Sequence, residues 1–367
     1  MGRVSKTYTE GKARIVGGEG VFLNPAMKGL RDVSVAFLKC SAPSKFSILD
    51  STAATGIRGI RYAQEAGAGT VVALDVNPKA SRNARRNFTA NKIEGMVMNK
   101  DLQLFSIEAP EKFDVVDLDP FGSPAPYIND VLKVSKDGSL LMVTATDTAV
   151  LCGAHASACV KQYGAVPIHN HLCKEAGLRI LIGHVIKKAA EFNMGVEPMV
   201  SLADMHYMRV FVKLRKGASE AYGSMKSLGF GKYCNSCSWA GVSVGITPKA
   251  VYRCSECGNE TQQFGHIFTG KLNNRRITGD MLKSGIEDGH SERTISCLNL
   301  EPEVPFFISM PVITRKLGIS SVPYGAVIER LKGRGYAAGR TIFNEDGIKT
   351  DAPVSDVVSI VKELKGV

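Results

Sequence analysis

The feature that most constrains the fold is an alternation of β-rich and helical segments over residues 46–214. Strands are predicted at 46–50, 70–75, 95–98, 113–119, 138–144, 199–203 and 207–214. Helices are predicted at 57–65, 79–90 and 174–193. Alternation at this spacing indicates an α/β protein with a doubly wound sheet. The last two strands are separated by only a few residues, so we expect them to pair antiparallel.

Three of the predicted strands end in an aspartate, namely Asp50, Asp75 and Asp119. Ligands of doubly wound sheets lie beyond the carboxyl ends of the strands, so these carboxylates are expected at one rim of the sheet. The turn between Asp50 and Gly56 lacks the GxGxxG pattern that lets a backbone approach a pyrophosphate. This argues against NAD and FAD and favours a less anionic ligand.

S-adenosylmethionine suits such a rim. Asp75 can accept hydrogen bonds from ribose hydroxyls, and Asp101, after a further predicted strand, can accept one from the adenine amine. Asp50 adds negative charge near the sulfonium. Each aspartate taken singly is more ordinary, because aspartates are common in turns and at helix N-termini.

The segment Asp119-Pro120-Phe121-Gly122 is typical of enzymes that methylate amino groups. The lone pair of an exocyclic amine is delocalised into the base, which makes the amine a poor nucleophile. Two acceptors, the Asp119 carboxylate and the Pro120 carbonyl, would favour a more tetrahedral nitrogen, and Phe121 offers a face for stacking. Asp117 is a second, deeper candidate. A plain turn after a buried strand is the simpler interpretation.

A base paired in a duplex could not reach this pocket, so the target must be flipped out or already unstacked. The net charge of +11 and the pI near 9.2 suggest a polyanionic partner, most simply nucleic acid. Two basic clusters are candidates for contact with it. They comprise Lys79, Arg82, Arg85, Arg86 and Lys92 in one helix, and Arg330, Lys332, Arg334, Tyr336 and Arg340 near the C-terminus.

With these motifs the sequence resembles the archaeal form of the tRNA (guanine(26)-N(2))-dimethyltransferase family over nearly the whole chain. The resemblance is carried by 22–25, 31–32, 51–61, 119–124, 144–148, 178–181, 206–210, 340–343 and 347–353. It implies a class I, Rossmann-like S-adenosylmethionine-dependent methyltransferase domain joined to a smaller α/β C-terminal domain that binds tRNA. It also implies transfer of one and then two methyl groups to N2 of guanine 26.

The resemblance further implies roles for individual residues. Arg31 would hold the methionine carboxylate and Arg58 would line the cofactor turn. Asp75 would bind the ribose, and Asp101 with the backbone of Leu102 would bind the adenine. Asp119 would act on the guanine amine.

Two cysteine pairs, Cys234–Cys237 and Cys254–Cys257, have the spacing of a zinc ribbon. Four thiolates would close the coordination sphere, so Zn²⁺ would be structural. An iron centre or two disulfides remain alternatives.

The composition changes after Gly217, and we expect three regions, at 1–229 (catalytic), 230–265 (zinc ribbon) and 266–367 (C-terminal). Helices are predicted in the last region at 270–285, 322–333 and 355–365.

The chain lacks a long apolar run, and its first residues, Met1 to Lys6, lack the apolar core of a secretory signal. We therefore expect a cytoplasmic protein without membrane contact, and nothing in the sequence indicates an obligate protein partner.

Two other functions stay open. One is an amine methyltransferase acting on another nucleic-acid base, and the other is a non-catalytic zinc-ribbon protein that binds RNA.

Overall fold

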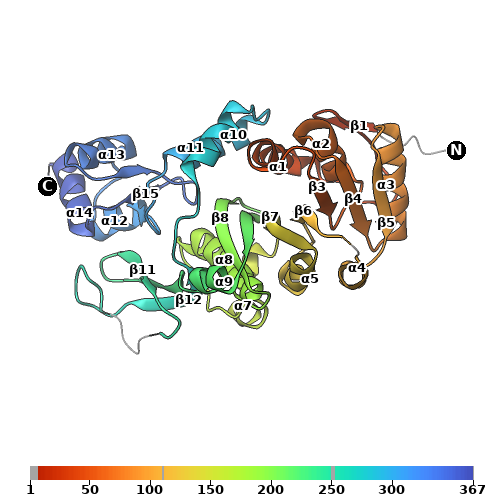
Figure 1. The fold of residues 1–367 in the computed structure, drawn as a ribbon. Helices are drawn as coiled ribbons and strands as arrows, with labels where there is room; N and C mark the ends of the chain where they lie inside the picture. The colour runs from red at the N-terminus through yellow and green to blue at the C-terminus, as the bar shows by residue number, and fades with distance from the viewer. Residues whose placement is uncertain (1–6, 110, 249–252, 367) are drawn as a thin grey trace.

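The structure is a computed structural model that describes residues 7–109, 111–248 and 253–366 (Figure 1). The predicted absence of a signal at Met1–Lys6 therefore lies outside the described residues. In the described part, the largest sheet has seven strands in the order β5-β4-β3-β6-β7-β9-β8. This is the doubly wound α/β sheet that the sequence predicts.

The first five strands of this sheet are parallel. They are β3 (Ser47–Asp50), β4 (Thr70–Asp75), β5 (Gly95–Asn99), β6 (Phe113–Leu118) and β7 (Ser135–Ala145). The strands β8 (Met194–Ala203) and β9 (Met208–Lys216) pair antiparallel to each other, and β9 pairs antiparallel to β7. The expected antiparallel pair is confirmed, and each of its strands is longer than predicted.

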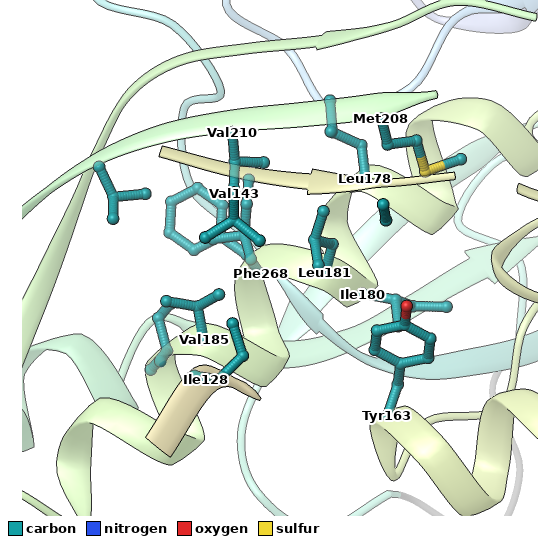
Figure 2. Close-up of a cluster of buried hydrophobic side chains, with 14 of the residues drawn as sticks. Ile128, Val143, Tyr163, Leu178, Ile180, Leu181, Val185, Met208, Val210 and Phe268 are labelled. Carbon is teal, nitrogen blue, oxygen red and sulfur yellow. The ribbon is translucent and has the colours of Figure 1, made fainter. Parts of the chain in front are cut away.

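Helices cover both faces of the sheet (Figure 1). They include α2 (Ile57–Ala66), α3 (Pro78–Ala90), α4 (Leu102–Glu108), α5 (Ile128–Lys133), α6 (Thr148–Leu151), α7 (Ala156–Tyr163) and α8 (Cys173–Ala190). Helix α8 is the most buried of these, since it is covered by the sheet on one side and by a second sheet on the other. Figure 2 shows Leu178, Leu181 and Val185 of α8 in one buried cluster with Val143 and Val210 of the main sheet, and with Phe268 beside the two valines.

Among the described residues, four N-terminal elements precede the sheet, and the sequence analysis did not predict them. They are the hairpin β1 (Thr7–Glu10) and β2 (Ala13–Val16), the short helix η1 (Pro25–Met27), and α1 (Lys28–Ser41). Helix α1 buries Arg31 and Asp32 together with its apolar residues. Periodicity of apolar residues misses such a helix, because its charged residues are buried by ion pairs with distant segments.

A second sheet follows, in the order β11-β10-β12. It consists of β10 (Leu228–Tyr233), β11 (Ala240–Val244) and β12 (Gln262–Phe268), and α9 (Ala218–Met225) leads into it. Phe264, Ile267 and Phe268 of β12 enter the core around α8. The cysteine segment is therefore packed against the main sheet domain through α8.

The C-terminal part begins with two helices, α10 (Arg275–Lys283) and α11 (Gly289–Leu300), which pack on α1. The helix predicted at 270–285 thus begins five residues later, where Asn274 caps its first turn. Beyond it lies a small sheet of β13 (Ile308–Ser309), β15 (Gly347–Thr350) and β14 (Ala338–Arg340). With α12 (Met310–Leu317), α13 (Tyr324–Gly333) and α14 (Val354–Lys365), this sheet forms a separate core.

A buried ionic cluster joins this C-terminal part to α8. Lys349 of β15 lies 3.3 Å from the carboxylate of Glu175 and 3.2 Å from that of Glu301. Arg179 lies 2.8 Å from the other oxygen of Glu175 and donates to the carbonyls of Phe268 and Gly270. The C-terminal sheet is therefore fixed to α8 by charges that water does not screen.

In the described ranges, no helix combines the length and the apolar character that crossing a membrane requires.

Candidate active site

A cavity of about 640 Å³ opens at the carboxyl edge of the main sheet. Its wall contains eight of the nine residues predicted to bind the cofactor or to act in catalysis. They are Arg31, Arg58, Asp75, Asp101, Leu102, Asp119, Pro120 and Phe121. The parallel strands β3, β4 and β6 end at this edge, and this explains why residues far apart in the sequence meet there.

Asp75 ends β4 and holds the turn after β3. Its two carboxylate oxygens accept the N–H groups of Ala54, at 2.9 Å, and of Asn77, at 2.8 Å. The turn itself closes at Gly56, which has a φ of +79°. A Cβ at Gly56 would also lie 2.9 Å from the Phe88 ring, so glycine is required twice over. Each oxygen of Asp75 keeps a lone pair for a ligand hydroxyl.

Asp101 is the N-cap of α4. Its Oδ1 accepts from the N–H of Gln103 at 2.8 Å, while its other oxygen makes no hydrogen bond to a described residue. The next residue, Leu102, is the first of the helix, and its N–H has no partner inside the helix. The same short segment therefore offers one acceptor and one donor to the cavity.

Arg31 lies on α1 and lines the cavity, although it is 4% exposed. Its Nε and Nη2 donate to the two oxygens of Glu10, at 2.6 and 2.5 Å. Nη2 also donates to the carbonyl of Asn24. Glu10 comes from the N-terminal hairpin, so a segment that the sequence analysis did not single out fixes the orientation of this guanidinium. A bidentate pair of this kind leaves Nη1 for an anion.

Asp50 is the one predicted cofactor residue that the structure places apart from the others. It is fully buried behind the turn and does not line the cavity, and its Oδ2 accepts the N–H of Gly59 at 3.2 Å. Burial, together with the nearby Asp117 carboxylate, raises the pKa of Asp50 to about 7. The geometry corrects the expectation from sequence, since Asp50 supports the start of α2 from below and does not face a ligand.

Asp119 directly follows β6 and faces the cavity. Its Oδ2 lies 2.5 Å from Nη2 of Arg58, which is buried at the start of α2. Burial acts to raise the pKa of this carboxyl, but the guanidinium groups of Arg58 and Arg209 outweigh it and hold the pKa below its ordinary value. Asp119 is therefore an anion and a pure hydrogen-bond acceptor at neutral pH.

The backbone around Asp119 is held on both sides. The N–H of Asp119 donates to Oγ1 of Thr52, at 3.2 Å. Gly122 exchanges hydrogen bonds with Thr146, donating its N–H to Oγ1 at 2.7 Å and accepting the Thr146 N–H at 3.0 Å. Between these anchors, the Pro120 carbonyl accepts no hydrogen bond from a described residue. The loop therefore presents two oxygen acceptors from adjacent residues.

Phe121 is 74% exposed, an unusual degree for a phenylalanine, and it packs edge to face against Phe22. The two ring centroids are 4.6 Å apart, with an interplanar angle of 82°. Both rings line the cavity. Phe22 belongs to the segment before η1, and although residues 22–25 contribute to the family resemblance, the sequence analysis assigned Phe22 no role in the site.

Beneath Asp119 lies a fully buried polar cluster centred on Asp117. Arg209 of β9 lies 2.9 Å from Asp117, and the Tyr62 hydroxyl donates to it at 2.5 Å. Arg209 also donates to Thr144 at 2.6 Å. Asp117 thus does not face the cavity, which agrees with its lower ranking from the sequence. The cluster compensates buried charge and supports the strand ends that carry Asp119.

The four predicted metal ligands also come together. The sulfur atoms of Cys234, Cys237, Cys254 and Cys257 lie within 4.8 Å of one another, and two of the pairs are 3.5 Å apart. Tetrahedral zinc–thiolate bonds of about 2.3 Å would place the sulfurs about 3.8 Å apart. The separations exceed a disulfide bond of about 2.05 Å. The donor set therefore fits a tetrahedral ion such as Zn²⁺.

The two basic clusters differ in their surroundings. The residues Lys79, Arg82, Arg85 and Arg86 of α3 are exposed, as is Lys92, which lies in the turn just after the helix and not on it as expected. None of the five makes an ion pair with a described residue. In the C-terminal cluster, Arg330 and Arg334 both pair with Glu363 of α14, and the Tyr336 hydroxyl donates to Asp356. The α3 face is thus the more available cationic surface.

Comparisons with known proteins identify the family. The family model for N2,N2-dimethylguanosine tRNA methyltransferase matches residues 2–362. A tRNA (guanine(26)-N(2))-dimethyltransferase of Thermococcus kodakarensis is 35% identical over 96% of each chain, and one of Pyrococcus furiosus is 33% identical over 96% of this chain and 95% of its own.

A solved structure is also similar, the complex of Trm1 from Pyrococcus horikoshii with S-adenosyl-L-methionine. It matches with a TM-score of 0.89 and 31% identity, over 97% of this chain and 99% of its own. The resemblance noted in the sequence is thereby confirmed, and the chain belongs to the N2,N2-dimethylguanosine tRNA methyltransferase family.

Proposed function

We propose that this protein dimethylates N2 of the guanine at position 26 of tRNA, in two successive transfers from S-adenosylmethionine. The observation that carries the proposal is the single cavity that joins Asp75 and Asp101 at one end to Asp119 and Pro120 at the other. The names of the T. kodakarensis and P. furiosus relatives supply the base and its position.

The cavity residues fit S-adenosylmethionine along its length. Asp75 would accept from the ribose hydroxyls, Asp101 from the adenine amine, and the free N–H of Leu102 would donate to a ring nitrogen of adenine. The guanidinium of Arg31, oriented by Glu10, would bind the methionine carboxylate. When bound, the cofactor supplies an electrophilic methyl group on its sulfonium.

Asp119 and Pro120 would prepare the amine of guanine. The Asp119 carboxylate accepts one N–H and the Pro120 carbonyl accepts the other, which draws the nitrogen lone pair out of the ring plane. Because Arg58 keeps Asp119 ionised, the carboxylate does not compete as a donor. Catalysis then depends mainly on holding the amine in line with the methyl group. The proton that the nitrogen carries in excess after each transfer would leave through the Asp119 carboxylate to water.

One acceptor of this pair would serve the second transfer. After one methylation the amine retains a single N–H, which Asp119 can still accept. The added methyl group would lie against the exposed rings of Phe22 and Phe121, whose contact is apolar.

Access to the cavity requires guanine 26 to leave the base stack. The exposed cationic face of α3 would grip phosphates beside the target, and the C-terminal part would add contacts through Lys332 and Arg340. The four cysteines would bind one structural Zn²⁺, because four thiolates leave no open coordination position for a substrate.

The test uses the full-length protein, S-adenosylmethionine and a tRNA transcript. Mass spectrometry of the digested nucleosides should show monomethylguanosine and then dimethylguanosine, and a transcript with adenine at position 26 should accept no methyl group. Methylation of the adenine transcript would point to another base as the target. Binding of the transcript without any methylation would favour the non-catalytic RNA-binding alternative.

A further inference from the structure

The cavity has one wall that neither the cofactor nor the Asp119 loop uses. It includes His206, which belongs to the turn between β8 and β9 and lines the same cavity as Asp119 and Pro120. We propose that the imidazole of His206 donates a hydrogen bond to the O6/N7 edge of the target guanine and thereby selects guanine over other purines. This inference rests on the proposed function.

Sheet topology places His206 at the height of the base. Thr144 of β7 pairs with Arg209 of β9, and β7 separates β9 from β6, the strand that Asp119 follows. Neighbouring strands lie about 4.8 Å apart, so the axes of β6, which Asp119 follows, and β9, which His206 precedes, are about 10 Å apart. His206 precedes β9, whose first residue, Met208, pairs with the last residue of β7, so His206 lies beyond the same edge of the sheet as Asp119, and it lines the cavity.

The turn is held so that His206 has a defined position. The N–H of Asp204 donates to the carbonyl of Tyr207 at 2.9 Å, and the N–H of Met205 donates to the Asp204 carboxylate at 2.7 Å. His290 of α11 lies 3.5 Å from the same carboxylate. The imidazole of His206, by contrast, makes no hydrogen bond or ion pair with a described residue. A fixed turn thus presents an unused donor to the cavity.

Guanine has the matching chemistry. Its N2 amine lies on the minor-groove edge, whereas O6 and N7, both acceptors, lie on the opposite major-groove edge. With the amine held by Asp119 and Pro120, the O6/N7 edge points across the cavity toward the β8–β9 turn. 2-Aminopurine keeps the N2 amine but has a C–H in place of O6, so it would leave a donor at His206 without that acceptor.

The experiment compares tRNAs in which position 26 is guanine, 2-aminopurine or 7-deazaguanine. 2-Aminopurine keeps the reactive amine and lacks O6, and 7-deazaguanine lacks N7. If His206 donates to O6, kcat/KM of the wild-type protein should fall about tenfold with 2-aminopurine, and if it donates to N7, the same fall should occur with 7-deazaguanine. His206→Phe, which keeps a ring without a donor, should methylate guanine and the affected analogue at equal rates. His206→Gln, which keeps an N–H donor, should retain part of the preference.

Tyr127→Phe is the matched control, because it removes another hydrogen-bond donor that lines the cavity. It should leave the preference for guanine intact. Cofactor binding by each variant verifies that it is folded. The inference is overturned if His206→Phe keeps the full preference, if wild type shows none, or if Tyr127→Phe abolishes it. Failure of wild type on guanine itself would instead refute the proposed function.

Discussion

The carboxylate of Asp119 and the guanidinium of Arg58 lie 2.5 Å apart at the base of the cavity, although one follows β6 and the other opens α2. The pair sets both the charge and the direction of the acceptor that would meet the substrate amine. Because Arg58 is itself buried, the contact is screened little by solvent or salt. The reactivity of Asp119 is therefore linked to the position of α2.

Replacing Asp119 should separate binding from chemistry. Asp119→Ala removes the acceptor for the amine, so we expect kcat to fall at least about a hundredfold, as for the loss of a preorganised electrostatic contact. Binding of S-adenosylmethionine and tRNA should persist, since the cofactor contacts lie at the other end of the cavity. Single-turnover methylation and calorimetric titration of the cofactor measure the two effects. Unchanged turnover would reject the assigned role.

Replacing Arg58 should change the pH dependence of the reaction. In the wild type the pKa of Asp119 is lowered, so Asp119 stays ionised down to acidic pH. In Arg58→Met, Arg58 no longer opposes the effect of burial, so the pKa of Asp119 should rise. When the pH is lowered, the variant should therefore lose methyl transfer at a higher pH than the wild type does. The pH profile of single-turnover rates tests this. Arg215→Met, on the exposed part of β9, is the control whose profile should match wild type.

The four-cysteine site should contribute to stability. Purified protein should contain about one zinc ion per chain, and Cys254→Ser should lose the metal and lower the apparent Tm by about 5 °C or more. Cys297→Ser, outside the cluster, should retain the metal. Elemental analysis and thermal unfolding provide the readouts. Iron in place of zinc, or oxidised thiols without metal, would contradict the assignment.

The buried cluster around Lys349 should make stability depend on pH in a variant. Lys349→Met leaves Glu175 and Glu301 buried without their shared cation, at a cost of about 3–5 kcal/mol. In the wild type, burial already raises the pKa of Glu301, whereas Lys349 and Arg179 hold that of Glu175 below its ordinary value against the opposing effect of burial. Without Lys349, the pKa values of both carboxyls in the folded state would rise. The loss of stability should therefore be small at acidic pH and grow as the pH rises through those values.

Denaturant unfolding at pH 5 and pH 8 checks the sign of this effect. The double variant Lys349→Met/Glu301→Gln should recover part of the stability at pH 8. A cost that is equal at both pH values would show that the cluster is not ionised as described.

The cationic face of α3 should dominate the salt dependence of tRNA binding. Arg82→Ala/Arg86→Ala removes two exposed charges, so the slope of log K against log salt should become less steep by about 1.4–1.8. Cofactor affinity should not change. Arg330→Ala/Arg334→Ala, whose side chains pair with Glu363, is the comparison and should have the smaller effect. Equal effects of the two double variants would count against a special role for α3.

Local patterns predicted much of the site. Asp75, Asp101 and Asp119 follow apolar strands, and parallel strands end at one edge, so the sequence was enough to place them together. The same rule failed for Asp50. Its strand ends at that edge too, but the carboxylate turns toward the N–H of Gly59 and is buried. Which way a side chain at a strand end turns depends on the following loop.

Contacts between segments that are distant in the chain could not be predicted from the sequence. Neither the pairing of Arg31 with Glu10 nor that of Asp117 with Arg209 follows from any local period. The same holds for Arg330 and Arg334, which form a basic cluster in the sequence yet face Glu363 in space. Where a charged residue is used by the fold itself, sequence spacing alone overestimates the charge offered to a partner.

The ion pairs of Lys349 also have a geometric consequence. They clamp the small C-terminal sheet to α8, while α10 and α11 lie along α1, so the distance from that sheet to the methylation pocket is fixed. An RNA that touches both must present its target base at the matching separation. The protein would then select RNA by the distance between its two contact points, independently of the identity of the target base.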